Sequence, residues 1–224
     1  MTGMLASVAN LDEAILVQAA GADIIDLKAP RRGALGALQA DAVEAIVQRL
    51  GFFSVISATV GDLPMQPEIV QPAVERMGAT GVNYVKIGLF PGGDWSSTIR
   101  ALKAPAMQGT RLIAVFFADC DPDSRWFAEL CGAGFAGIML DTRNKGAGSL
   151  RQILSHDRIE NFVTRARQFG LLCGLAGSLR YEDIDSLLEL SPDYLGFRGA
   201  LCIDKNRVGR LNPEALRTIR GKIA

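Results

Sequence analysis

The sequence predicts one (β/α)8 barrel, or TIM barrel, formed as a single domain by residues 1–224. Short apolar runs rich in β-branched residues alternate with amphipathic runs of helical period, a pattern typical of repeated βα units. Eight such units follow one another, which is the number that closes a barrel. The segment after the first strand, ASVANLDEA, lacks the G-x-G-x-x-G turn that usually opens a doubly wound sheet.

The first four units are read from the amino-terminal half. The expected strands cover residues 4–8, 22–28, 52–60 and 82–89, and the expected helices cover residues 11–20, 43–50, 69–77 and 95–102. Asn10, with Glu13 three residues later, resembles a capping box that starts the first helix, and Gly21 ends it. Spaced apolar residues mark one face of the second helix.

The last four units follow the same alternation. The expected strands cover residues 111–118, 137–140, 171–175 and 194–197, and the expected helices cover residues 126–130, 159–169 and 184–188. The last helix begins at Pro213 after the cap Asn212. The connections after the second and sixth strands are longer than the others, and both follow strand carboxyl ends, where barrel active sites form.

The composition argues against several classes of function. The net charge is zero, so nothing indicates a nucleic-acid or membrane partner. The sequence shows neither a signal peptide nor a long apolar run, and we expect a cytoplasmic protein with reduced, mostly buried cysteines. The single histidine, His156, disfavours histidine triads and multi-histidine metal sites, and we expect no metal.

Charged residues on two strands are expected to point into the barrel mouth. Because strand side chains alternate, Asp26 and Lys28 share the inward face, while Ile25 and Leu27 pack on the helices. The same alternation is expected to bring a second lysine, Lys86, into the mouth from the fourth strand. Only six of the 24 basic residues are lysines, so their position at strand ends is informative.

A further pair lies at the sixth strand, which ends in Asp141 and is followed by Lys145. A lysine in a desolvated mouth beside another cation has a lowered pKa, and its free amine can act as a nucleophile or base. Asp26 and Asp141 would hold these cations and relay protons. Alternatively, these charges form ordinary rim ion pairs, each contributing at most about 1 kcal/mol.

Two glycine-containing loops are candidates for phosphate binding. Gly177 and Ser178 follow the seventh strand, and Gly199 and Ala200 follow the eighth. Backbone N–H groups in such loops approach an anion closely, and barrels commonly hold phosphate there. Alternatively, the glycines only form tight turns. The loop 29–37, which includes Arg31 and Arg32, could cover the substrate or form a subunit contact.

Several motifs occur together in this chain. They are Asp26-Leu27-Lys28 followed by Pro30, Gly33 and Leu35-Gly36-Ala37, then VKIGL at 85–89, LDTRNKGAGSL at 140–150 and GLAGSL at 174–179. With these motifs the chain resembles the (5-formylfuran-3-yl)methyl phosphate synthase family, also called 4-(hydroxymethyl)-2-furancarboxaldehyde-phosphate synthase. The resemblance extends over nearly the whole sequence.

The resemblance implies a lyase that condenses two molecules of glyceraldehyde 3-phosphate, with loss of phosphate and water, without a cofactor. It implies that Lys28 forms a Schiff base and that Lys86 transfers protons, with Asp26, Asp141 and Lys145 completing the site. The product would serve methanofuran or methylofuran biosynthesis, and the alanine- and arginine-rich composition favours methylofuran. The loop at Ala29 and Arg31-Arg32 departs from the family pattern, which bears on substrate contacts.

Two other functions fit the same residues. A class I aldolase or isomerase barrel acting on another sugar phosphate would use the same lysine and phosphate loops. A non-catalytic barrel could instead bind a phosphorylated metabolite or a protein partner. Apolar loop and helix residues also favour a homo-oligomer.

Overall fold

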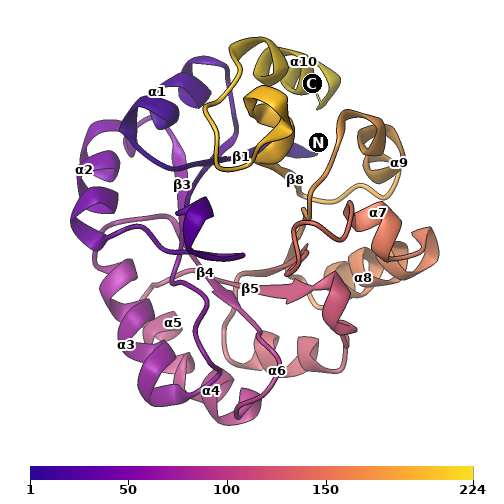
Figure 1. The fold of residues 1–224 in the computed structure, drawn as a ribbon. Coiled ribbons are helices and arrows are strands. Elements are labelled where there is room, and N and C mark those ends of the chain that lie inside the picture. The colour runs from indigo at the N-terminus through magenta and orange to yellow at the C-terminus, as the bar shows by residue number, and fades with distance from the viewer. Residues whose placement is uncertain (224) are drawn as a thin grey trace.

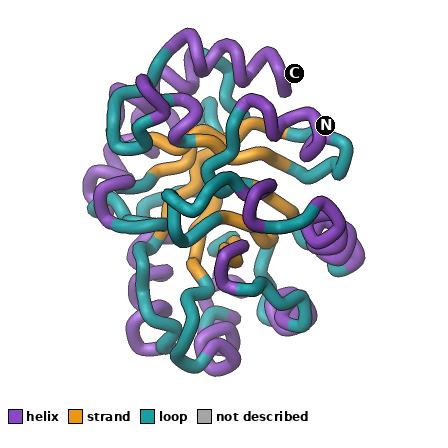
Figure 2. Tube along the Cα trace, turned by 45° about the vertical axis from the view of Figure 1, so that its right-hand side comes forward, coloured by secondary structure: helices purple, strands orange, loops and turns teal. Residues whose placement is uncertain are grey.

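The computed structural model describes residues 1–223 as a closed barrel of eight parallel strands (Figure 1). Each strand pairs with the next along the chain, and β8 pairs with β1 to close the ring. Figure 2 shows the strands at the centre, surrounded by helices and loops. The predicted fold class is therefore confirmed. Among the described residues, no helix has the length and apolar character needed to cross a membrane.

The strands are short, as expected for a barrel of this size. They are β1 Gly3–Val8, β2 Ile24–Leu27, β3 Val55–Thr59, β4 Tyr84–Gly88, β5 Leu112–Phe117, β6 Gly137–Asp141, β7 Leu172–Leu175 and β8 Tyr194–Phe197. Because all eight run in parallel, their carboxyl ends meet on one face of the barrel. The loops that follow them form the mouth described below.

The helices form the outer layer. They are α1 Leu11–Ala19, α2 Ala40–Leu50, α3 Pro67–Gly78, α4 Trp95–Ala101, α5 Lys103–Met107, α6 Trp126–Gly132, α7 Leu150–Ile153, α8 His156–Gln168, α9 Ile184–Leu188 and α10 Pro213–Ile223. Short 3-10 turns are η1 Pro30–Arg32, η2 Ala118–Cys120, η3 Tyr181–Asp183, η4 Gly199–Leu201 and η5 Ile203–Lys205.

Side-chain caps start the helices where the sequence predicts them. The Asn10 side chain accepts a hydrogen bond from the Glu13 N–H at 2.9 Å, and the Glu13 carboxylate accepts one from the Ala9 N–H at 2.8 Å. At α10 the Asn212 side chain accepts from the Glu214 N–H at 2.9 Å. These bonds satisfy N–H groups that have no partner within the helix.

The structure corrects some element boundaries. Phe52 and Phe53 form an exposed turn, 91% and 80% accessible, rather than the start of the third strand. Pairing with β2 begins only at Val55, so their apolar character did not indicate a strand. The short helices α5 and α7 were not predicted because each is too short to show a helical period. Two of the four cysteines, Cys173 and Cys202, are buried.

Two apolar layers hold the fold together. Between strands and helices, Phe116, Phe127 and Phe162 pack edge to face, with ring centroids 5.0 to 5.6 Å apart. This layer also contains Ile25, Leu27, Val85 and Ile87, as the alternation predicts. A second cluster fills the barrel interior and consists of Leu5, Ala34, Leu35, Ile113, Val115, Phe117, Met139, Ala176 and Tyr194.

Candidate active site

Four neighbouring strands place a polar cluster around Asp26. Ladder pairing sets Ser7 of β1 and Ser57 of β3 directly beside Asp26 of β2. The fully buried carboxylate accepts hydrogen bonds from the Ser7 hydroxyl at 2.9 Å and the Ser57 hydroxyl at 2.8 Å. The Lys86 Nζ lies 2.6 Å from one carboxylate oxygen, and the Lys28 Nζ lies 3.9 Å from the other. Both amines therefore contact one carboxylate.

Burial and charge both act on these groups. Burial lowers the pKa of Lys28 to about 8, assisted by the charges of Lys86 and Lys145 and opposed by those of Asp26 and Asp141. Burial alone would raise the pKa of Asp26, but the charges of Lys86 and Lys28 outweigh it and hold the pKa below its ordinary value. The Lys28 amine is therefore neutral much more often than an ordinary lysine.

A second ion pair lies at the end of β6. The Lys145 Nζ is 2.5 Å from an oxygen of Asp141, which also accepts from the Thr142 N–H at 2.7 Å. Burial raises the pKa of Asp141, but Lys145 and Lys28 outweigh it and lower the pKa below its usual value. Because Asp141 also raises the pKa of Lys28, the two ion pairs act on one another electrostatically.

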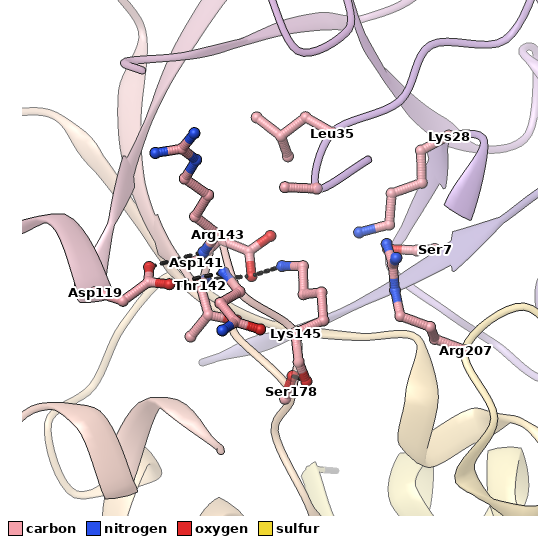
Figure 3. Close-up of polar contacts among 12 residues, drawn as sticks. Ser7, Lys28, Leu35, Asp119, Asp141, Thr142, Arg143, Lys145, Ser178 and Arg207 are labelled. Carbon is pink, nitrogen blue, oxygen red and sulfur yellow. Dashed lines mark hydrogen bonds and ion pairs between the residues drawn. The ribbon is translucent and has the colours of Figure 1, made fainter. Parts of the chain in front are cut away.

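Asp119, which sequence reasoning did not identify, fixes the loop that contains Lys145. Its carboxylate accepts from the N–H groups of Arg143 at 2.8 Å and Asn144 at 2.7 Å (Figure 3). From the other side, the Ser178 hydroxyl donates to the Lys145 carbonyl at 3.2 Å. Asp119 lies just past the predicted fifth strand, at its carboxyl end, and that position was the available signal.

A cavity of about 930 Å³ opens at the carboxyl ends of the strands. It is lined by Lys28, Asp141 and Lys145, by all four residues predicted to bind phosphate, and by the unpredicted Ser7 and Arg207. We call it the mouth cavity. Seven of the nine residues predicted for the site thus line this cavity, whereas Asp26 and Lys86 do not.

The prediction that Lys86 enters the mouth is wrong, because its side chain points inward but does not line the mouth cavity. It borders a smaller cavity of about 390 Å³ with Tyr84 and Tyr194, and we call this the rear cavity. The side chain of Leu35, 1% exposed, is part of the interior cluster and lies close to Gly88 at the end of β4. Leu5 lines both cavities. Asp26 thus connects Lys28, which lines the mouth cavity, with Lys86, which borders the rear cavity.

The two predicted phosphate loops present backbone donors to the mouth cavity. Within residues 1–223, the N–H groups of Ser178, Leu179, Gly199 and Ala200 donate to no protein acceptor. Gly177 has a φ of +105°, and a Cβ there would lie 2.8 Å from the Thr142 side chain, so a larger residue would be strained. These loops have the chemistry to bind an anion.

Arg198, which lies between the end of β8 and Gly199, has a structural role. Its guanidinium pairs with Glu13 at 2.5 Å, and it donates to the carbonyls of Arg207 at 2.8 Å, Gly209 at 2.9 Å and Ser7 at 3.1 Å. Both side chains of the ion pair are largely buried. Arg198 therefore connects β1, α1 and the segment 198–212, which we call the β8 loop.

Replacing Arg198 with methionine should lower the free energy of unfolding by about 3–5 kcal/mol, because it leaves the Glu13 carboxylate buried without its cation. Urea denaturation followed by circular dichroism measures the change. Arg220→Met is the matched control, since its pair with Asp23 is partly exposed and is expected to contribute at most about 1 kcal/mol. Equal losses in the two variants would contradict the assignment.

The structure also bears on metal binding. In the part of the chain that the structure describes, no group of three or more His, Cys, Asp or Glu side chains is placed to hold a metal ion. His156 is the first residue of α8, with Ser155 as the cap that accepts from the Arg158 N–H.

Comparison with known sequences gives a consistent set of relatives. The family model described as 4-HFC-P synthase matches residues 4–220. A Methylorubrum extorquens protein named provisionally as (5-formylfuran-3-yl)methyl phosphate synthase is 42% identical, over 91% of this chain and 84% of its own length. The (5-formylfuran-3-yl)methyl phosphate synthase of Methanopyrus kandleri is 34% identical, over 99% of this chain and 98% of its own length.

Solved structures with the same fold are more distant in sequence. Phosphoribosyl anthranilate isomerase from Thermus thermophilus superposes with a TM-score of 0.68 at 20% identity, covering 99% of this chain and 98% of its own. The 3-hexulose-6-phosphate synthase from Salmonella typhimurium superposes with a TM-score of 0.71 at 15% identity, with the same coverage. At these identities the likeness shows the barrel fold alone.

Proposed function

The chain belongs to the 4-HFC-P synthase family, and we propose that it condenses two molecules of glyceraldehyde 3-phosphate into (5-formylfuran-3-yl)methyl phosphate. Atom balance requires that one phosphate and two water molecules leave. The main support is the position of the Lys28 amine, which is buried, has a lowered pKa and lines the mouth cavity. The furan phosphate synthases among the relatives supply the reaction class.

The first step we propose is covalent. The neutral Lys28 amine attacks the aldehyde carbon of one triose phosphate, and loss of water from the carbinolamine gives an iminium ion. This cation withdraws electrons from the neighbouring carbon, which then releases a proton and forms an enamine. Asp141 lines the mouth cavity and is ionised, so it is the acceptor we assign to that proton.

Carbon–carbon bond formation follows. The enamine attacks the aldehyde carbon of the second triose phosphate, and the Lys145 ammonium donates to the oxygen on which negative charge develops. Elimination of phosphate breaks a carbon–oxygen bond, which makes the enzyme a lyase. A hydroxyl of the second triose then attacks the iminium carbon, which closes the ring and expels the Lys28 amine, and loss of water gives the aromatic furan.

Lys86 acts through Asp26 in this proposal. Because it borders the rear cavity, its amine does not reach a substrate in the mouth cavity directly. Asp26 accepts from Lys86 at 2.6 Å and lies 3.9 Å from Lys28, so this carboxylate can pass protons between the two amines.

The unpaired N–H groups of Ser178, Leu179, Gly199 and Ala200 bind the phosphate of the triose attached to Lys28. No metal or redox cofactor takes part in the steps proposed here. In this proposal the product enters methylofuran or methanofuran biosynthesis. The protein itself is cytoplasmic and consists of one domain.

Purified protein incubated with glyceraldehyde 3-phosphate alone tests the proposal. We expect the ultraviolet absorbance of a furan aldehyde to appear together with inorganic phosphate, and borohydride to trap an adduct at Lys28 that mass spectrometry locates. An aldolase or isomerase of another sugar phosphate would give neither furan nor phosphate. Absence of both products would overturn the proposed reaction, and absence of the adduct would remove the imine step.

The initial rate of imine formation should rise with pH, reach half its maximum near pH 8 and level off above about pH 9. Below the Lys28 pKa of about 8 the amine is protonated and unreactive, and above it the amine is neutral. At pH 7 about a tenth of Lys28 is neutral, against roughly one molecule in 3,000 for an ordinary lysine. Quenching with borohydride across the range of about pH 6 to 10 measures the profile. A rate that still rises tenfold per unit above pH 9 would contradict the lowered pKa.

A further inference from the structure

We propose that Arg207 forms a second anion site in the mouth cavity, which binds the phosphate of the second triose. This inference rests on the proposed function, because that reaction needs two phosphorylated molecules in the cavity at once. The loops after β7 and β8 supply one set of anion donors. A cavity of about 930 Å³ leaves room for another small molecule beside it.

Arg207 is held in position before any ligand binds. Its carbonyl accepts a hydrogen bond from the Nε of the buried Arg198 at 2.8 Å. A backbone bridge between Cys202 and Leu211 closes the base of the β8 loop around it. The Arg207 side chain therefore extends into the cavity from a fixed backbone, and its binding geometry requires little reorganisation.

The guanidinium of Arg207 has more N–H donors than its contacts within the protein use. It donates to the Pro30 carbonyl at 2.8 Å and to the Gly33 carbonyl at 3.2 Å. Guanidinium has five N–H donors, and within the described residues the other three donate to no protein acceptor. The group is half-buried and lines the cavity together with Lys28, so its free donors are available to a ligand.

The surrounding charges favour an anion at this position. Figure 3 shows the Arg207 guanidinium and the Lys28 amine extending toward each other at one side of the site, with Lys145 and Asp141 on the other. Two cations beside a partly desolvated cavity attract a phosphate dianion, and a planar guanidinium can bind two of its oxygens at once. Arg198 cannot serve in this way, because Glu13 and backbone carbonyls occupy its donors.

The contacts to Pro30 and Gly33 give Arg207 a second effect. Both carbonyls belong to the segment 29–39 that follows Lys28, which we call the β2 loop. The Asp62 carboxylate holds the same loop through the N–H groups of Ala34 at 2.9 Å and Leu35 at 2.7 Å. Phosphate bound by Arg207 would therefore lie against the β2 loop and help to cover the second triose.

Binding of glycerol 3-phosphate, which has no carbonyl and cannot react, tests this site by isothermal titration calorimetry. We expect two molecules to bind each wild-type chain and one to bind each Arg207→Met chain, or the second to bind about 10- to 100-fold more weakly. Arg207→Lys should give an intermediate affinity, because lysine keeps the charge but not the planar pair of donors. Arg210→Met is the matched control, an exposed arginine of the same loop outside the cavity lining.

Trapping at Lys28 separates this inference from its alternatives. If Arg207 binds the second phosphate, Arg207→Met should still give the borohydride adduct of the first triose while its furan formation falls at least tenfold. If Arg207 only holds the β2 loop, the binding stoichiometry stays at two, and the inference is overturned. A wild-type protein that binds one molecule also overturns it. A protein that binds two molecules but forms no adduct or furan would instead overturn the proposed function.

Discussion

Replacing Lys28 with methionine should reduce furan formation by roughly 10⁴-fold or more, because it removes the proposed nucleophile, on which every later step of the proposed mechanism depends. Methionine fills a similar volume without an amine, so the barrel interior stays packed. Product absorbance and phosphate release measure the loss. Borohydride should then leave no adduct at position 28.

Two further variants make the Lys28 result specific. Lys28→Arg keeps a cation beside Asp26 but cannot form an imine under these conditions, and it should be as inactive as the methionine variant. Lys103→Met removes an exposed lysine on α5 and should leave the rate unchanged. Substantial turnover in Lys28→Arg would show that the positive charge, rather than covalent chemistry, is what the enzyme needs.

Replacing Lys86 with methionine should lower the turnover number by about 10²–10⁴-fold while the adduct at Lys28 still forms. The reason is that Lys86 contacts Asp26 and not the mouth cavity, so its loss impairs proton transfer and leaves the nucleophile in place. Single-turnover trapping and steady-state product formation, measured on the same preparation, separate the two effects. Loss of the adduct as well would place Lys86 in the covalent step.

The pH profile gives Lys86→Met a second readout. The Lys86 charge lowers the pKa of Lys28, so removing it should raise that pKa above about 8 and move the rising limb to higher pH. The Asp26 charge raises the pKa of Lys28, so Asp26→Asn should move the limb to lower pH. Variants that only perturb packing would not shift the profile in opposite directions. Unfolding curves recorded alongside confirm that each variant is folded.

The barrel and its charged strand ends could be predicted because both follow from short-range patterns. Alternation along β2 is sufficient to turn Asp26 inward and Ile25 outward, and the structure shows both. The same rule turned Lys86 inward, but it gives direction and not height along the barrel. Leu35, from a loop with no periodic signal, is packed in the barrel interior close to Gly88, and Lys86, two residues earlier on β4, borders the rear cavity.

The residues missed in the sequence depend on contacts between separate units. Asp119 follows β5 but binds the N–H groups of Arg143 and Asn144, which follow β6. Arg207 belongs to the β8 loop and contacts the loop after β2, more than 170 positions earlier in the chain. Neither partner can be inferred from local spacing, because the closure of the ring is what brings these loops together.

Leu5 is the one residue, within the described chain, that lines both the mouth cavity and the rear cavity. Its side chain therefore belongs to the apolar partition, formed together with other residues of the interior cluster, between the mouth cavity and the opposite end of the barrel. In the proposed mechanism the iminium ion must survive until the second triose arrives, and hydrolysis competes with that encounter. Under that mechanism, an intact apolar partition that includes Leu5 would favour condensation over return to the free aldehyde.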